Sequence, residues 1–306
     1  MFSRVLRFPL TLLVFEGAAL MAVAIGYSRG AAAMGVLDKG PLQFAGALLF
    51  AALIIGLWKL LRSKLEADQD REFTFAGAGT ELTAGLGIGF LLFSTVVGIA
   101  ALLGGFEVLG LRGLGLGLNG GGKGALWSML SLAVFSGVFE ETLLRGILLR
   151  HLESLLGTWS ALAISAAIFG GLHLINPDAT PFAAIAIAME AGILLGAAYL
   201  LTRRLWLAVG LHAAWNFTQG WVFSVPVSGG PAPLGLLITR RVGPEWLTGG
   251  NFGLEASVVA LVVATAVGVA MLVLARRHRQ FIAPMWQRTK AAPAGQDAAA
   301  DNSAVV

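Results

Sequence analysis

Apolar runs about as long as a bilayer is thick recur along this chain of 306 residues. A membrane-spanning helix needs roughly 20 mostly apolar residues. Lipid accepts only helices or closed barrels, because backbone polar groups must find partners within the protein. The eight runs are Phe8–Tyr27, Phe44–Leu61, Leu82–Gly104, Ala125–Leu149, Thr158–Ile175, Phe182–Thr202, Leu205–Phe223 and Phe252–Ala275. They predict an all-α fold, a polytopic transmembrane helical bundle with about eight membrane-spanning helices.

Composition excludes several classes of protein. The chain is 57% hydrophobic and only 12% charged, whereas soluble domains carry roughly 25% charged residues. It contains no cysteine, which excludes disulfides, thiolate metal sites and cysteine nucleophiles. The net charge is +4, but the basic residues lie between the apolar runs, so we expect a lipid bilayer and no nucleic acid as partner.

We expect residues 1–279 to form one integral membrane domain and residues 280–306 a mostly disordered, small and polar tail. Arg4 and Arg7 precede the first run as in a signal peptide, but the run is too long for one, and we expect a retained helix. The glycine-rich segment Gly110–Gly124 and the proline-containing segment Ser224–Gly250 are expected to be irregular loops.

Basic residues between the runs indicate the orientation, because lysine and arginine are enriched in cytoplasmic loops. With the N-terminus cytoplasmic, the inner segments hold fourteen basic residues, Arg4, Arg7, Lys59, Arg62, Lys64, Arg71, Arg150, Arg203, Arg204, Arg276, Arg277, Arg279, Arg288 and Lys290. The outer segments hold six, Arg29, Lys39, Arg112, Lys123, Arg240 and Arg241. This asymmetry predicts an integral protein of the cell (inner) membrane with both termini in the cytoplasm.

Charged residues interrupt the fourth apolar run at Glu140, Glu141 and Arg145. Each costs a few kcal/mol in hydrocarbon, even on the most lenient insertion scale. Glu141 and Arg145 are four residues apart and share a helix face, which predicts an ion pair. Glu140 is rotated about 100° around the helix, so it can face a different neighbour.

Two more helices carry polar residues at a spacing of four. Phe169 and His173 share a face of the fifth run, and His212 and Asn216 share a face of the seventh. Each pair alone is compatible with interhelical packing or a single hydrogen bond. Together with Glu140 they must converge on one another or on a wet cavity, because lipid penalises them. A carboxylate, two imidazoles and a carboxamide are sufficient for hydrolysis.

Other polar residues in the runs are weaker candidates. Glu16 and Glu190 are isolated on their helices, and Glu255 lies near a helix start, where the helix dipole favours a carboxylate. His173 lies near the outer end of its run, whereas Glu140 and His212 lie in the inner halves of theirs. The three side chains can therefore meet only if helix tilt, or a fifth helix that starts deep in the membrane, closes an offset of several ångström along the helix axes.

The sequence resembles a known family at three motifs, Glu-Glu-x-x-x-Arg (Glu140–Arg145), Phe-x-x-x-His (Phe169–His173) and His-x-x-x-Asn (His212–Asn216). In this order on separate hydrophobic segments, they are similar to the motifs of the CAAX protease and bacteriocin-processing (CPBP) family, also called the abortive-infection family and typified by the type II CAAX prenyl endopeptidase. The stretch Gly192–Gln219 is similar outside the motifs too. The resemblance covers a protease-like core of about Ala125–Phe223.

The resemblance implies a role for each matching residue. Glu140 would be the base that activates a water, and His173 would assist at that water. His212 and Asn216 would donate hydrogen bonds to the oxyanion. The supporting residues would be Glu141, Arg145 and Phe169.

The predicted function is therefore an intramembrane endopeptidase that hydrolyses peptide bonds in or near the bilayer through a glutamate-activated water. Its partner would be a membrane-embedded or membrane-associated peptide or protein substrate. The alternative is a non-catalytic family member acting as a membrane scaffold, immunity or regulatory protein. A small-solute carrier is a weaker alternative, because no inverted repeat is visible.

Zinc is a further alternative, because Glu140, His173 and His212 have the composition of a catalytic zinc site. The two histidines lie on different helices without a short chelating motif, and Asn216, which shares a face with His212, is a poor zinc ligand. We therefore expect no cofactor.

Overall fold

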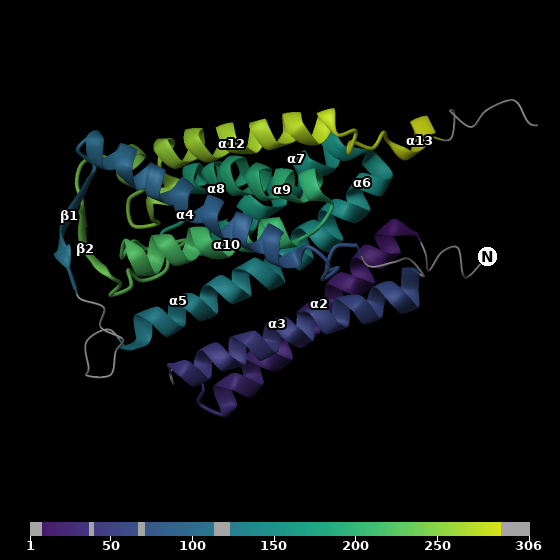
Figure 1. Cartoon of the computed structure of the whole chain (residues 1–306), viewed down its shortest axis with the longest axis horizontal. Coiled ribbons are helices and arrows are strands. Elements are labelled where there is room, and N and C mark those ends of the chain that lie inside the picture. The colour runs from purple at the N-terminus through teal and green to yellow at the C-terminus, as the bar shows by residue number, and fades with distance from the viewer. Residues whose placement is uncertain (1–7, 37–39, 67–70, 113–122, 289–306) are drawn as a thin grey trace, which may run out of the picture.

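A computed structural model of the chain describes residues 8–36, 40–66, 71–112 and 123–288, and Figure 1 shows long helices running the length of the molecule. The longer helices are α2 (Pro9–Ala33), α3 (Pro41–Leu61), α4 (Ala78–Leu102), α5 (Lys123–Phe135), α7 (Thr158–Leu172), α9 (Ile193–Thr202), α10 (Trp206–Phe217) and α12 (Val258–Arg277). The shorter ones are α6 (Arg150–Leu156), α8 (Pro181–Ile187), α11 (Glu245–Thr248) and α13 (Met285–Arg288). The predicted polytopic, helical membrane-protein fold is confirmed.

Short π-helical and 3₁₀ segments join several of these helices into longer rods. The π-helical segments are η1 (Arg62–Glu66), η2 (Ser136–Glu140), η3 (Thr142–Leu149), η5 (Ala188–Gly192) and η6 (Thr218–Val222). The 3₁₀ turns are η4 (His173–Ile175) and η7 (Leu254–Ala256). Because π segments are rare and frequently occur at functional sites, the helices that carry them are candidates for the site.

Within the described residues, six helices are long and apolar enough to cross a membrane, fewer than the predicted eight. They are Pro9–Ala33, Pro41–Glu66, Ala78–Leu102, Thr158–Ile175, Pro181–Thr202 and Val258–Arg277. The other two runs are helical as well. The fourth run lies in a helical segment from Lys123 to Leu156 that contains charged residues. The seventh run consists of the 12 residues of α10 and the five residues of η6.

A two-stranded antiparallel sheet at one end of the molecule (Figure 1) was not predicted. Strand β1 (Phe106–Leu111) pairs with β2 (Leu237–Arg241), and Phe106 lies opposite Arg241. Part of the expected loop Ser224–Gly250 is therefore strand. Most of the glycine-rich segment, at residues 113–122, and the end of the tail, at residues 289–306, lie outside the described residues.

Glycines bring α4 and α10 into close contact. A Cβ atom at Gly85 would lie 2.3 Å from the carbonyl oxygen of Leu207, and one at Gly89 would lie 2.4 Å from that of Leu211. Gly210 on α10 approaches the Leu82 carbonyl in the same way, at 2.4 Å. Small residues that let backbones approach closely are a common basis of helix packing in membranes. Helix α10, which carries two of the motif residues, is therefore held against α4.

A second set of close approaches joins the motif helices. A Cβ at Gly137 in η2 would lie 2.8 Å from the Val209 carbonyl on α10. Gly170 on α7 approaches the Ala184 carbonyl on α8, and Gly192 in η5 approaches Ala166 on α7. These contacts join the first motif segment to α10, and α7 to α8 and η5.

Candidate functional site

The first motif lies in helix of unusual geometry. The π-helical segments η2 and η3 flank Glu141 on either side, whereas the sequence suggested a regular α-helix. A π segment turns the chain less per residue, so adjacent side chains here do not follow the regular α-helical angles. The unusual turn coincides with the acidic pair, Glu140 and Glu141.

The predicted ion pair between Glu141 and Arg145 is confirmed. Both side chains are buried, and Nη1 of Arg145 donates to Oε1 of Glu141 at 2.8 Å. Nη2 of Arg145 donates to the backbone carbonyls of Ala191 at 3.0 Å and Gly192 at 3.3 Å. The guanidinium also lies 4.8 Å from the ring centre of Phe169, a cation–π distance. One arginine thus links η3 to η5 and α7.

Glu141 also binds His212, a contact that the sequence did not indicate. Oε1 of Glu141 lies 2.7 Å from Nδ1 of His212 and accepts from both this ring and Arg145. A carboxylate accepts hydrogen bonds, so Nδ1 carries the proton and Nε2 is left to face the site. A supporting carboxylate of this kind sets both the tautomer and the orientation of an imidazole.

Glu140 is placed differently from its neighbour. Its side chain is 28% exposed, whereas that of Glu141 is fully buried. Oε2 of Glu140 lies 3.9 Å from Nε2 of His212, which makes the two groups neighbours without a direct hydrogen bond. The carboxylate of Glu140 therefore remains accessible beside the free nitrogen of His212.

His173 reaches the same site from the end of α7. Its Nδ1 donates to the Phe169 carbonyl at 2.8 Å, which leaves Nε2 free. The Phe169 ring contacts both imidazoles, with its centre 4.7 Å from that of His173 and 6.2 Å from that of His212. His173 begins a 3₁₀ turn after α7 ends at Leu172, and it lines the same cavity as His212.

Asn216 lies one turn beyond His212 on the same face of α10. Its Nδ2 donates to Oγ of Ser136 at 2.9 Å, which ties α10 to η2. Only one of the two amide hydrogens is used in this bond, so the other is available. Oγ of Ser136 in turn lies 3.5 Å from the Ala133 carbonyl oxygen.

Residues of the second and third motifs line one cavity. Its polar lining residues are His173, Glu190, His212, Asn216, Ser228 and Glu255. Glu190 lies in η5 and Glu255 in η7, and the sequence predicted both only as weaker candidates for the site. Burial raises the pKa of the Glu255 carboxyl to about 7. Isolated acidic residues in apolar runs were the only sequence signal for these two residues.

The proposed zinc ligands do not form a compact set. Glu140 and His212 are close enough to share an ion. However, within the described residues, Glu140, His173 and His212 do not form a set of three side chains whose ligand atoms all lie within 4.8 Å of one another. A tetrahedral zinc site requires protein ligands about 2.0–2.2 Å from the ion. As they lie in this structure, the three side chains do not fit that requirement.

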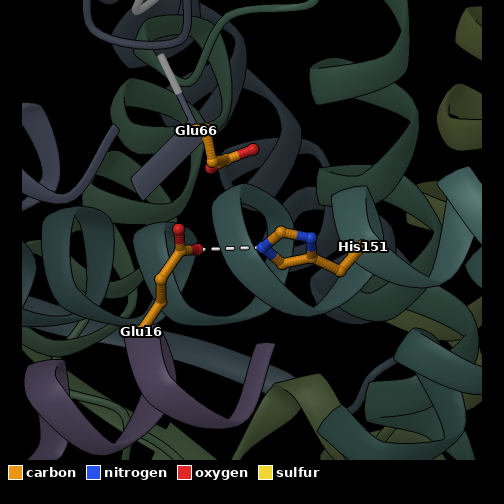
Figure 2. A group of neighbouring side chains, drawn as sticks. All are labelled: Glu16, Glu66 and His151. Atoms are coloured by element: carbon orange, nitrogen blue, oxygen red, sulfur yellow. Dashed lines mark hydrogen bonds and ion pairs between the residues drawn. The ribbon is translucent and has the colours of Figure 1, made fainter. Parts of the chain in front are cut away.

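The group that meets this distance criterion lies elsewhere, at Glu16, Glu66 and His151 (Figure 2). Its centre is filled by Arg150. Nη2 of Arg150 lies 2.8 Å from Glu66, 3.0 Å from His151 and 3.2 Å from Glu16. A guanidinium thus stands where a metal ion would stand, and it connects α2, η1 and α6. We call this group the Arg150 cluster.

Comparison with known proteins yields one match. Residues 122–218 match the family described as Type II CAAX prenyl endopeptidase Rce1-like. That range contains all three motifs. No curated protein and no solved structure matches the chain. The resemblance drawn from the motifs is therefore confirmed over residues 122–218, the part of this chain that is similar to the Rce1-like, type II CAAX prenyl endopeptidase proteins.

Proposed function

We propose that this protein is an intramembrane endopeptidase in which Glu140 takes a proton from the attacking water. The observation that carries the proposal is the position of Glu140, accessible and 3.9 Å from Nε2 of His212, which lines one cavity together with His173 and Asn216. The family match supports a peptidase. The substrate would be a peptide segment in or near the bilayer.

The other motif residues have complementary roles in this mechanism. Water attacks the scissile carbonyl as its proton passes to Glu140, and the proton then reaches the leaving amine. His173, with Nε2 free, assists at the water. Asn216 and the doubly protonated ring of His212 donate to the developing oxyanion. The carboxylate of Glu141, 2.7 Å from Nδ1, stabilises that protonated ring.

The experiment compares full-length protein and its Glu140→Gln variant, each in lipid nanodiscs, for cleavage of a membrane-protein extract followed by mass spectrometry of new termini. Loss of the base should lower cleavage by roughly 10²–10⁴-fold, with unchanged expression and melting temperature. Glu107→Gln, on the exposed strand β1, is the control and should retain activity. Equal cleavage by wild type and Glu140→Gln would favour the non-catalytic alternative.

Metal independence is part of the proposal and is checked in the same assay. A zinc-selective chelator should leave turnover unchanged, because oxyanion donors worth about 2.7–4 kcal/mol each can substitute for a Lewis acid. Activity that disappears with chelator and returns with added zinc would contradict this expectation.

A further inference from the structure

Glu190 lines the cavity beside His173, His212 and Asn216. It is 1% exposed, and neither carboxylate oxygen has a hydrogen-bond partner within the described part of the chain. A buried carboxylate without a donor is costly, so buried polar groups in native proteins are nearly always paired. A ligand that brings a donor or a positive charge would relieve this cost.

The helix turn that carries Glu190 is fixed to the candidate catalytic network. Glu190 lies in the π-helical segment η5, immediately before Ala191 and Gly192. The carbonyls of these two residues accept from Arg145, the residue that also pairs with Glu141. The position of the Glu190 carboxylate is therefore coupled to that of the reacting groups.

A second carboxylate adds to the acidity of the cavity. Glu255 lines the cavity from η7, and its Oε1 accepts from the backbone N–H of Ser228. Burial raises the pKa of Glu255 to about 7. Among the described residues that line the cavity there is no lysine and no arginine.

The rest of the lining suits a long side chain with a charged end. Phe169, Ile187, Leu194 and Leu195 form apolar walls beside the two carboxylates. Lysine and arginine bury an apolar stem and keep a charged head for a polar partner. A metal ion fits less well, because within the described residues Glu190 and Glu255 belong to no set of three ligand atoms that all lie within 4.8 Å of one another.

We propose that Glu190 and Glu255 form a subsite for a basic side chain, lysine or arginine, of the substrate peptide beside the cleaved bond. The proposal rests on the proposed endopeptidase function and specifies its substrate class. The basic head would meet the carboxylates while its stem contacts the apolar walls.

The experiment uses the full chain in lipid nanodiscs and a pooled peptide library. Each peptide carries either lysine or norleucine, which has a similar stem without the charge, at matched positions. Wild type should cleave lysine peptides with a kcat/KM at least roughly tenfold higher, the size of one charge-assisted hydrogen bond. Glu190→Gln and, separately, Glu255→Gln should reduce this ratio towards one. Glu107→Gln, whose side chain is exposed on β1, should keep the ratio of wild type.

Binding to the Glu140→Gln variant separates this proposal from the proposed function, because binding needs no hydrolysis. This variant should bind lysine peptides more tightly than norleucine peptides, and adding Glu190→Gln should abolish the difference. Cleavage without any lysine preference, or a preference that survives in both Gln variants, would overturn the subsite and leave the endopeptidase function intact. If wild type cleaves no more than the Glu140→Gln variant, the endopeptidase function is overturned. If Glu140→Gln also binds lysine and norleucine peptides equally, the subsite is overturned as well.

Discussion

Glu140 and Glu141 are adjacent in the sequence, yet their carboxylates have different surroundings. Glu140 is partly exposed beside Nε2 of His212, whereas Glu141 is fully buried between Arg145 and Nδ1 of His212. The buried carboxylate organises the site, and the accessible one remains available for chemistry. This division resembles the pairing of a reactive group with an orienting carboxylate in other hydrolases.

The division predicts different defects for the two glutamates. Glu141→Gln removes the counter-charge of buried Arg145, and breaking such a pair typically costs about 3–5 kcal/mol. We expect a lower melting temperature and low abundance, with Arg145→Ala similar. Any folded Glu141→Gln protein should also turn over slowly, because His212 loses its orienting carboxylate.

Melting temperatures and expression of Glu140→Gln, Glu141→Gln and Arg145→Ala in one membrane preparation provide the measurement. Equal stability of all three variants would contradict the assigned roles. Glu107→Gln controls for the loss of an exposed carboxylate.

Glycines allow helix α10 to pack closely against α4. Gly89 of α4 faces the Leu211 carbonyl on α10, one residue before His212, whereas nothing lies within 4 Å of a Cβ at Gly87. Two glycines on the same helix thus have opposite environments. Matched substitutions at Gly89 and Gly87 can therefore test the packing of α4 against α10.

Gly89→Ala should push α10 away from α4, because its Cβ would lie only 2.4 Å from the Leu211 oxygen. Overpacking of this kind costs about 1–3 kcal/mol, and a displacement near 1 Å at reacting groups can cost roughly 100-fold in rate. Gly87→Ala is the matched control and should change neither melting temperature nor turnover. Similar behaviour of the two variants would exclude the proposed packing role.

At the scale of the molecule, the Arg150 cluster joins the N-terminal helices to the segment that matches the family. Glu16 on α2 and Glu66 in η1 lie outside residues 122–218, whereas Arg150 and His151 lie inside. Arg150 forms ion pairs with both acids, at 3.2 Å and 2.6 Å. The cluster is therefore a polar connection between two parts of the bundle.

Arg150→Met should destabilise the protein by about 3–5 kcal/mol, since it leaves two acids of the cluster without their shared cation. Arg240→Gln removes an exposed ion pair, with Glu107, and should cost at most about 1 kcal/mol. Thermal unfolding in detergent compares the two. A Met variant as stable as Arg240→Gln would show that the cluster contributes little.

The orientation in the membrane stays a prediction from the charge asymmetry. Figure 1 places the start of α2 and the end of α12 at the same end of the molecule, opposite the β1–β2 sheet. The chain has no cysteine, so introduced cysteines report without background. Ser63→Cys should react with an impermeant maleimide only from the cytoplasm, and Ala232→Cys only from outside. Reversed labelling would invert the predicted topology.

The sequence by itself determined the features that depend on neighbours along the chain. Apolar runs of spanning length predict helices, since lipid leaves the backbone few alternatives. A spacing of four predicts the pair of Glu141 and Arg145, because both side chains lie on one helix. The motifs, also short and local, sufficed to indicate the family.

Only the tertiary structure decided what depends on how the helices dock. Glu141 and His212 are 71 residues apart, and their contact requires η2 to approach α10 at Gly137. The strands β1 and β2 pair across a similarly long separation, so neither segment shows its partner locally. Glu190 and Glu255 read as isolated charges in sequence because the cavity that collects them exists only when helices from different segments close around it.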